Sequence, residues 1–112
     1  MIVITGAAGF IGSCLISKLN NEGLEHLILV DDFSQEQKID NYHTKNFVQK
    51  IDRSEFLTWF EEHAPEVTFV FHIGARTDTT EFNVELFNEL NLNYTKSIWT
   101  TCTKHFIPMV YA

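Results

Sequence analysis

The chain has 112 residues, of which 45% are hydrophobic, so it is one domain or part of one with enough apolar side chains for a core. A formal net charge of −7 argues against nucleic acid or an anionic membrane surface as a partner. No apolar run approaches the roughly 18 residues of a membrane span, and no basic segment precedes an N-terminal apolar one as in a secretory signal. Cys14 and Cys102 lack metal-ligand spacing, and we expect two buried, reduced thiols, as in the cytoplasm.

The first third of the chain follows the pattern of a βαβ unit. An apolar strand over Met1–Ile4 leads into a glycine-rich turn and a helix from about Phe10 to Asn20, which Gly23 ends. A second apolar strand, Leu27–Val30, is followed by Asp31. These elements fit in the roughly 30 residues that such a unit needs.

The turn carries three glycines, and each meets a physical need. Gly6 permits a tight turn off the strand, Gly9 lets a diphosphate approach the backbone, and Gly12 lets the helix lie close to the sheet. The helix N-terminus adds unpaired N–H groups and a partial positive charge, while Asp31 can hydrogen-bond a ribose diol. A turn without a ligand is the alternative, but the strand, helix and acid around it favour a dinucleotide site.

A polar loop, Asp32–Lys45, follows and would lie beside the adenosine half of a dinucleotide. Lys38 in this loop could meet a 2′-phosphate, or it could be an ordinary solvated lysine. Asp31 and Asp32 together would repel a 2′-phosphate. The residues alone therefore leave NAD and NADP both open.

The rest of the chain predicts a doubly wound parallel sheet of α/β class. Helices are expected to pack on the sheet through apolar stripes, one of which includes Ile11, and another of which includes Trp99 and Phe106. Right-handed crossovers then give the strand order 3-2-1-4-5 of a Rossmann-type fold. The expected elements are a strand at Asn46–Val48, a helix at Ser54–His63 with Ser54 as N-cap, a strand at Val67–His72, a helix at Val84–His105 and a strand at Pro108–Ala112.

The end of the fourth strand is the other candidate site, because ligands of such sheets bind at the carboxyl ends of strands. Gly74 and Ala75 allow close backbone approach there, and the polar loop from Arg76 to Glu81 suits an anionic or polyhydroxyl ligand or simply caps the next helix. We interpret His72 as a hydrogen-bonded core histidine rather than a site residue. Asn91 interrupts an apolar helix face and needs a partner, either cofactor or backbone.

These motifs resemble the extended short-chain dehydrogenase/reductase superfamily, and within it the ADP-L-glycero-D-manno-heptose 6-epimerase family, over essentially the whole chain. The matching segments are the cofactor turn with Gly6, Gly9, Phe10, Ile11 and Gly12; Asp31 and Asp32; Lys38 with Asn41; Asp52, Arg53, Phe56 and Leu57; the run His72 to Glu81 with Ile73, Gly74, Ala75, Arg76 and Thr77; and Asn91 with Tyr94, Thr95 and Lys96.

The resemblance implies a cofactor and a reaction. The cofactor is NADP, with NAD as the alternative, and it is held by the matching glycine-turn, Asp31, Asp32, Lys38, Arg53, Ile73–Thr77 and Asn91 positions. Arg53 stands in place of a cofactor-contacting lysine, Asp32 where some members have Asn, and Ile73 where others have an acid. The implied reaction inverts one centre of a nucleotide-activated heptose by hydride abstraction and return, in cytoplasmic lipopolysaccharide synthesis by a homo-oligomer.

The superfamily's catalytic hydroxyl and Tyr-x-x-x-Lys pair have no match before Ala112. We therefore expect this chain to be the N-terminal part of a Rossmann domain, inactive alone, with the catalytic and substrate-binding part beyond it. Two alternatives stay open: a non-catalytic NAD(P)-binding module, and a related sugar-nucleotide 4-epimerase or dehydratase.

Overall fold

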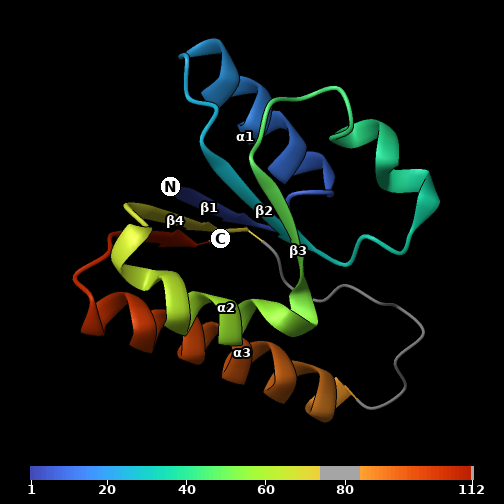
Figure 1. Cartoon of the computed structure of the whole chain (residues 1–112). Helices are drawn as coiled ribbons and strands as arrows, with labels where there is room; N and C mark the ends of the chain where they lie inside the picture. The colour runs from blue at the N-terminus through green and yellow to red at the C-terminus, as the bar shows by residue number, and fades with distance from the viewer. Residues whose placement is uncertain (74–83, 112) are drawn as a thin grey trace.

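In a computed structural model, the described residues form a five-stranded parallel sheet in the order β3-β2-β1-β4-β5, which confirms the predicted order (Figure 1). The structure describes the backbone of residues 1–73 and 84–111, and the side chains of these ranges except 84–91. The elements are β1 (Ile2–Thr5), α1 (Phe10–Asn21), β2 (Leu27–Asp31), the 3₁₀ helix η1 (Glu36–Asn41), β3 (Gln49–Asp52), α2 (Arg53–His63), the 3₁₀ helix η2 (Ala64–Glu66), β4 (Phe69–His72), α3 (Val84–Lys104) and β5 (Met109–Tyr111).

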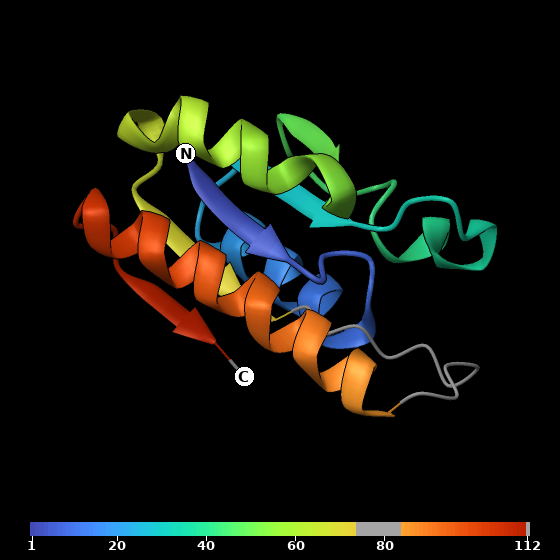
Figure 2. The same ribbon diagram turned by 90° about the horizontal axis from the view of Figure 1, so that it is seen from below.

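Helices cover both faces of the sheet, as expected for a doubly wound fold. In Figure 1, α1 lies above the sheet and α2 and α3 lie below it, and Figure 2 shows α2 and α3 side by side across that lower face. Alternate strand residues point to opposite faces. Thus Val3 packs with Phe56 and Phe60 of α2, whereas its neighbour Ile4 packs with Ile16 of α1.

The third strand lies three residues later than predicted. The apolar pair Phe47 and Val48 suggested a strand, but Phe47 packs edge-on against Tyr42 and Val48 is 56% exposed. The strand pairs through the polar segment Gln49–Asp52, of which only Ile51 is buried. This sequence suits β3 because β3 is a sheet edge, where little apolar surface is covered.

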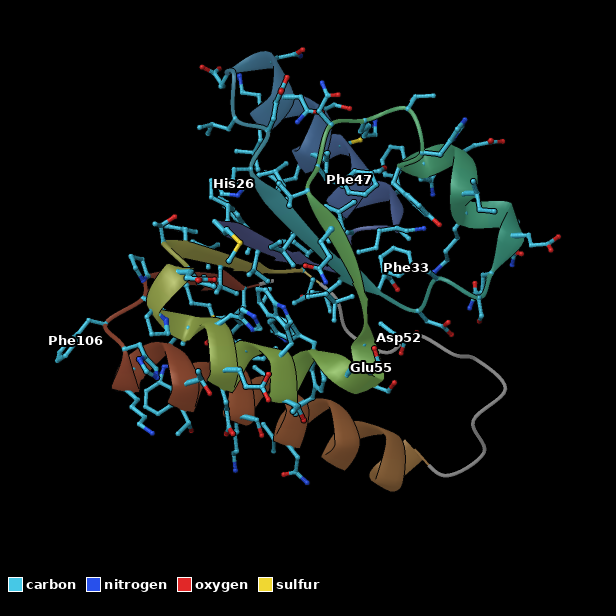
Figure 3. All side chains as sticks on the ribbon, viewed as in Figure 1. His26, Phe33, Phe47, Asp52, Glu55 and Phe106 are labelled. Carbon is cyan, nitrogen blue, oxygen red and sulfur yellow. The ribbon has the colours of Figure 1, made fainter. Side chains whose placement is uncertain are left out.

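The start of α2 also differs from the prediction. Asp52, rather than Ser54, is the N-cap, and its carboxylate accepts hydrogen bonds from the backbone N–H of Ser54 at 2.9 Å and from the Ser54 hydroxyl at 2.7 Å. Figure 3 shows Asp52 at the point where β3 meets α2. The helix therefore begins at Arg53, immediately after Asp52, the last residue of β3.

Three apolar residues that were expected to pack on the sheet are exposed. Ile11 is 65% exposed at the start of α1, and Trp99 is 57% exposed on α3. Phe106 lies past the end of α3 at φ +57°, is 93% exposed, and projects away from the sheet (Figure 3). The stripe on α3 is thus narrower than predicted, with Ile98 and Cys102 as its buried members among residues 92–104.

Two further expectations about α1 have different outcomes. Gly23, at φ +82°, follows the helix and Leu24 N–H donates to the Leu19 carbonyl, so the predicted C-terminal glycine is confirmed. Cys14, in contrast, is exposed rather than buried because it faces away from the sheet, whereas Cys102 is buried. Within the described ranges, no helix is long and apolar enough to cross a membrane.

Candidate functional site

Strands β1 to β4 end on the same side of the sheet, and polar side chains gather at these carboxyl ends, which we call the carboxyl edge. Thr5 of β1 pairs laterally with Val30 of β2 on one side and with His72 of β4 on the other. Asp31 of β2 lies opposite Asp52 of β3. Ligands of doubly wound sheets bind at this edge, where the strand order reverses between β1 and β4.

A cavity of about 310 Å³ opens at this edge, and it gathers most of the predicted residues that the structure describes. Thr5, Val30 and Tyr94, which were not predicted as site residues, also line it. The predicted residues that line it are Gly6, Gly9, Phe10, Ile11, Gly12, Asp31, Lys38, Arg53 and Ile73.

The glycine turn is built as its spacing predicts. Gly6 adopts φ +69°, a conformation that side chains disfavour, and its carbonyl accepts a hydrogen bond from Gly9 N–H at 3.1 Å. A Cβ on Gly12 would lie 2.2 Å from the Gly6 oxygen, whereas one on Gly9 would lie 3.3 Å from the same atom. Gly12 is therefore required for close packing of α1 on the turn itself, and Gly9 leaves the backbone bare toward the cavity.

The N-terminus of α1 lies in the wall of the cavity. Its N-cap is Gly9, and no described side chain caps it, so the N–H groups of the first turn lack side-chain partners there. Backbone N–H groups and the helix dipole favour an anion in this position. The exposed side chains of Phe10 and Ile11 flank the opening, which gives their exposure a place in the cavity wall.

Asp31 and Asn41 both bind the backbone of Ala8, inside the glycine turn. One Asp31 oxygen accepts from Ala8 N–H at 2.9 Å, and the other accepts from Asp32 N–H at 2.7 Å. The Asn41 amide donates to the Ala8 carbonyl at 2.8 Å and ties η1 to the turn. Each carboxylate oxygen has a further lone pair, so Asp31 can still accept a ribose hydroxyl.

Asp32 does not line the cavity. It is exposed, and its carboxylate accepts hydrogen bonds from the hydroxyl of Ser34 at 2.6 Å and from the Ser34 N–H at 3.0 Å. These bonds hold the pKa of Asp32 below its ordinary value. The side chain is thus occupied in closing its own loop.

Two cations come from separate elements into the cavity wall. Lys38 comes from η1 and Arg53 from the first turn of α2, and both are half-buried. The guanidinium carbon of Arg53 lies 4.3 Å from the centre of the Tyr94 ring, and the Tyr94 hydroxyl donates to the Arg53 carbonyl at 3.1 Å. With Asp31 as the acid beside them, these side chains give this part of the wall a net charge of +1.

His72 is the hydrogen-bonded core histidine that the sequence predicts. It is 4% exposed, and its ring nitrogens lie 2.6 Å from the Thr5 hydroxyl and 2.9 Å from the Thr95 hydroxyl. Burial, with a smaller effect from the charge of Arg53, lowers its pKa to about 4. The neutral ring therefore joins β1, β4 and α3, and its partner Thr5 lines the cavity.

Some predicted positions cannot be compared with the geometry. Gly74, Ala75, Arg76 and Thr77 lie outside the described residues, and so does the side chain of Asn91. Of the three additional lining residues, Thr5 had a sequence signal, because it is the last residue of a strand before the glycine turn. Tyr94 had a weaker one, in its place three residues after Asn91.

A second hollow, of about 510 Å³, lies at the amino ends of the strands, where β2 begins. Its walls include Glu25, Lys45 and Asn46. These polar groups already pair within the protein: Asn46 donates to Glu25 at 3.1 Å, and Lys45 donates to Ser17 at 2.5 Å. We therefore assign the site to the smaller cavity at the carboxyl edge.

The smaller cavity fits a dinucleotide in its chemistry. It combines a bare glycine backbone, a helix N-terminus, a carboxylate at the end of the second strand and two cations. A diphosphate suits the first two groups, a ribose diol suits the carboxylate, and phosphate oxygens suit Lys38 and Arg53.

Comparisons with known proteins agree with this architecture. Over its whole length the chain is 34% identical to the ADP-L-glycero-D-manno-heptose-6-epimerase of Fusobacterium nucleatum subsp. nucleatum, of which it spans 34%. The crystal structure of the Helicobacter pylori ADP-L-glycero-D-manno-heptose-6-epimerase superposes with a TM-score of 0.79 at 24% identity, covering 98% of this chain and 37% of that one. UDP-glucose 4-epimerase of Thermotoga maritima, solved with UDP-glucose, superposes with a TM-score of 0.69 at 22% identity, covering 98% and 36%.

The family assignment comes from a match along nearly the entire sequence. Residues 2–112 match the model of the NAD dependent epimerase/dehydratase family. The matched region contains the glycine turn, the carboxylate at the end of β2 and all five described strands. The chain therefore belongs to the NAD-dependent epimerase/dehydratase family.

Proposed function

We propose that this chain is the cofactor-binding part of an ADP-L-glycero-D-manno-heptose 6-epimerase that uses NADP. The observation that carries the proposal is the 34% identity, over all of this chain, to a heptose epimerase. The cavity supports it, because it is lined by residues matched to that family's cofactor site, which come from the turn after β1, from α1, β2, η1 and α2, and from the residue after β4.

Each part of the cavity takes one part of the dinucleotide in this proposal. The N–H groups at Phe10 to Gly12 bind the diphosphate, and Asp31 binds the adenosine ribose. Lys38 and Arg53 bind phosphate oxygens. NAD lacks the 2′-phosphate, so it would bind through the same groups without any contact to that phosphate. We extend the site to Ile73, Gly74, Ala75, Arg76, Thr77 and Asn91, with Asp32 at its margin.

The bound cofactor supplies hydride acceptance and return, which inverts one centre of the sugar. The residues of this chain fix where the cofactor lies, through the glycine backbone, the carboxylate and the two cations. A Tyr-x-x-x-Lys pair and a neighbouring hydroxyl, proposed to lie beyond Ala112, provide the acid–base step. The proposed substrate is a nucleotide-activated heptose, and the proposed setting is lipopolysaccharide synthesis in the cytoplasm by a homo-oligomer.

Titration of the 112-residue chain with NADP and NAD tests the cofactor half of the proposal. Gly9→Val is expected to abolish binding, because its branched side chain stands where the diphosphate approaches the backbone. Gly9→Ala is the matched control: its Cβ would lie 3.3 Å from the Gly6 oxygen, so the fold accepts it with a small adjustment and binding should weaken less. Unchanged affinity in Gly9→Val contradicts the proposed diphosphate site.

Lys38→Ala tests the preference for NADP. If Lys38 meets a 2′-phosphate, its loss weakens NADP more than NAD, by roughly tenfold for one charge-assisted contact. Equal losses for the two dinucleotides refute that contact.

Turnover by a protein that joins this chain to the proposed catalytic part tests the substrate. Epimerisation of ADP-heptose supports the proposal, whereas turnover of UDP-hexoses assigns the chain to a related 4-epimerase or dehydratase. Dinucleotide binding without any turnover of either class identifies a non-catalytic binding module.

A further inference from the structure

We propose that Asn41 is a positioning residue for Lys38. Asn41 ties the 3₁₀ helix η1 to the glycine turn, and this attachment holds Lys38 in the cavity wall, where it recognises the 2′-phosphate of NADP. The inference rests on the proposed function, since it takes the cavity as the dinucleotide site and Lys38 as the contact to that phosphate.

Asn41 connects η1 to the part of the chain that builds the diphosphate site. Its side-chain amide donates to the Ala8 carbonyl at 2.8 Å, across 33 positions of the sequence. Ala8 lies between Gly6 and Gly9, and its N–H donates to the Asp31 carboxylate at 2.9 Å. The helix η1 is therefore attached to a turn that is itself fixed to the end of β2.

Lys38 and Asn41 lie on the same side of η1. A 3₁₀ helix has three residues per turn, so side chains three positions apart lie one above the other. These two residues are half-buried, whereas the other four residues of η1 are exposed. The side of η1 that carries Asn41 thus faces the protein, and Lys38, one turn earlier on that side, lines the cavity.

The position of η1 depends on attachments at its C-terminal end. None of its residues is buried, and the hydrogen bonds within a 3₁₀ helix have poorer geometry than those of an α-helix. The next residue, Tyr42, is 3% exposed and lies edge-on to Phe33, with 5.2 Å between the ring centres. This single anchor does not fix the direction of a short helix, and the second attachment, at Asn41, does.

The direction of η1 matters because a carboxylate outside the cavity also attracts Lys38. Hydrogen bonds from Ser34 are the main reason that the pKa of Asp32 is lowered, and the positive charge of Lys38 adds to the effect. If η1 is released, the lysine side chain can move with it toward Asp32. Binding of the 2′-phosphate would then have to supply the free energy that brings the lysine back and orders it.

The test compares the dissociation constants (Kd) of the 112-residue chain for NAD and NADP as a ratio. A looser glycine turn weakens both dinucleotides, because both carry the diphosphate, whereas a displaced Lys38 weakens NADP alone. The ratio also cancels any unfolded fraction of a variant, which lowers both apparent affinities by the same factor. Asn41→Ala is expected to lower the ratio Kd(NAD)/Kd(NADP) by roughly fivefold, the cost of ordering one long side chain.

Two further variants separate positioning from general loosening. Asn20→Ala is the matched control, because the Asn20 amide also donates to a backbone carbonyl, that of Asn46 at 3.0 Å, just beyond the far end of the same loop. It should leave the ratio within about twofold of the wild type. Lys38→Ala should lower the ratio by roughly tenfold, and adding Asn41→Ala to it should lower the ratio no further, because the positioned group is gone.

The outcomes distinguish the inference from the proposed function. A ratio that Lys38→Ala lowers and Asn41→Ala does not, or an undiminished effect of Asn41→Ala in the Lys38→Ala background, overturns the inference alone. An equal fall in Asn20→Ala also overturns it. Equal losses of NAD and NADP in Lys38→Ala overturn the proposed 2′-phosphate contact and the inference with it, and a wild-type chain that binds neither dinucleotide overturns the proposed function.

Discussion

Acidification should weaken the fold through one buried side chain, His72. In the folded chain the pKa of His72 is lowered from 6.5 to about 4, mainly by burial. The unfolded chain therefore binds more protons between these values, and the free energy of unfolding falls as the pH drops from about 6.5 toward about 4. Above about pH 6.5 the contribution is fully present.

The size of the effect follows from the shift. Each pH unit inside this window removes at most about 1.4 kcal/mol, so acidification from about pH 7.5 to about pH 5 should remove about 2 kcal/mol. The physical reason is that a protonated ring can no longer accept from one of its two threonine partners, and its charge would be buried.

Urea denaturation of the wild type and of His72→Asn over this range isolates the effect. Other carboxylates and histidines titrate in both proteins, so their contributions cancel in the difference. The stability gap between the two proteins should narrow by about 2 kcal/mol on acidification. A gap that stays constant, or a His72 ring resonance that titrates near pH 6.5, refutes the reasoning.

Three further substitutions test the geometry by urea denaturation. Gly12→Ala should destabilise the chain by about 2–4 kcal/mol, because its Cβ would meet backbone atoms at 2.2 Å, while Gly9→Ala should cost much less; equal costs contradict the packing argument. Phe106→Gly should stabilise by about 0.5–1 kcal/mol by relieving φ +57° at a residue that is 93% exposed, and Phe106→Ala, which retains the strain, should not. Asp52→Ala should lose about 1 kcal/mol with the N-cap, and Asp52→Asn should retain most of it; no difference between them and the wild type contradicts the cap.

The sequence was most informative where local chemistry and the fold agree. The apolar strands β1 and β2 are central and buried, so their composition identified them, and the glycine spacing between them predicted the turn. The sheet order followed from the alternation of strands and helices, which fits a doubly wound sheet, together with right-handed crossovers. The buried role of His72 was also predictable, because a histidine at the end of an apolar strand is surrounded by core.

The sequence was least informative at the sheet edge and in long-range contacts. At β3, a polar edge strand follows an apolar loop residue, Phe47, that packs elsewhere, so composition pointed to the wrong segment. Tyr94 and Arg53 are 41 residues apart, and no local periodicity reports their contact. Exposure of Phe106 depends on where α3 ends, which a spacing of four residues does not specify.

The two hydrogen bonds at Ala8 lower the free-energy cost of ordering the glycine turn when a ligand binds. Its N–H is engaged by Asp31 and its carbonyl by Asn41, so both peptide groups flanking this residue are already immobilised by folding. In the proposed function, the diphosphate therefore meets a turn that folding has already ordered, and little interaction energy is diverted into ordering that stretch of backbone. The same acid and amide thereby hold a glycine-rich turn in one conformation before any ligand binds.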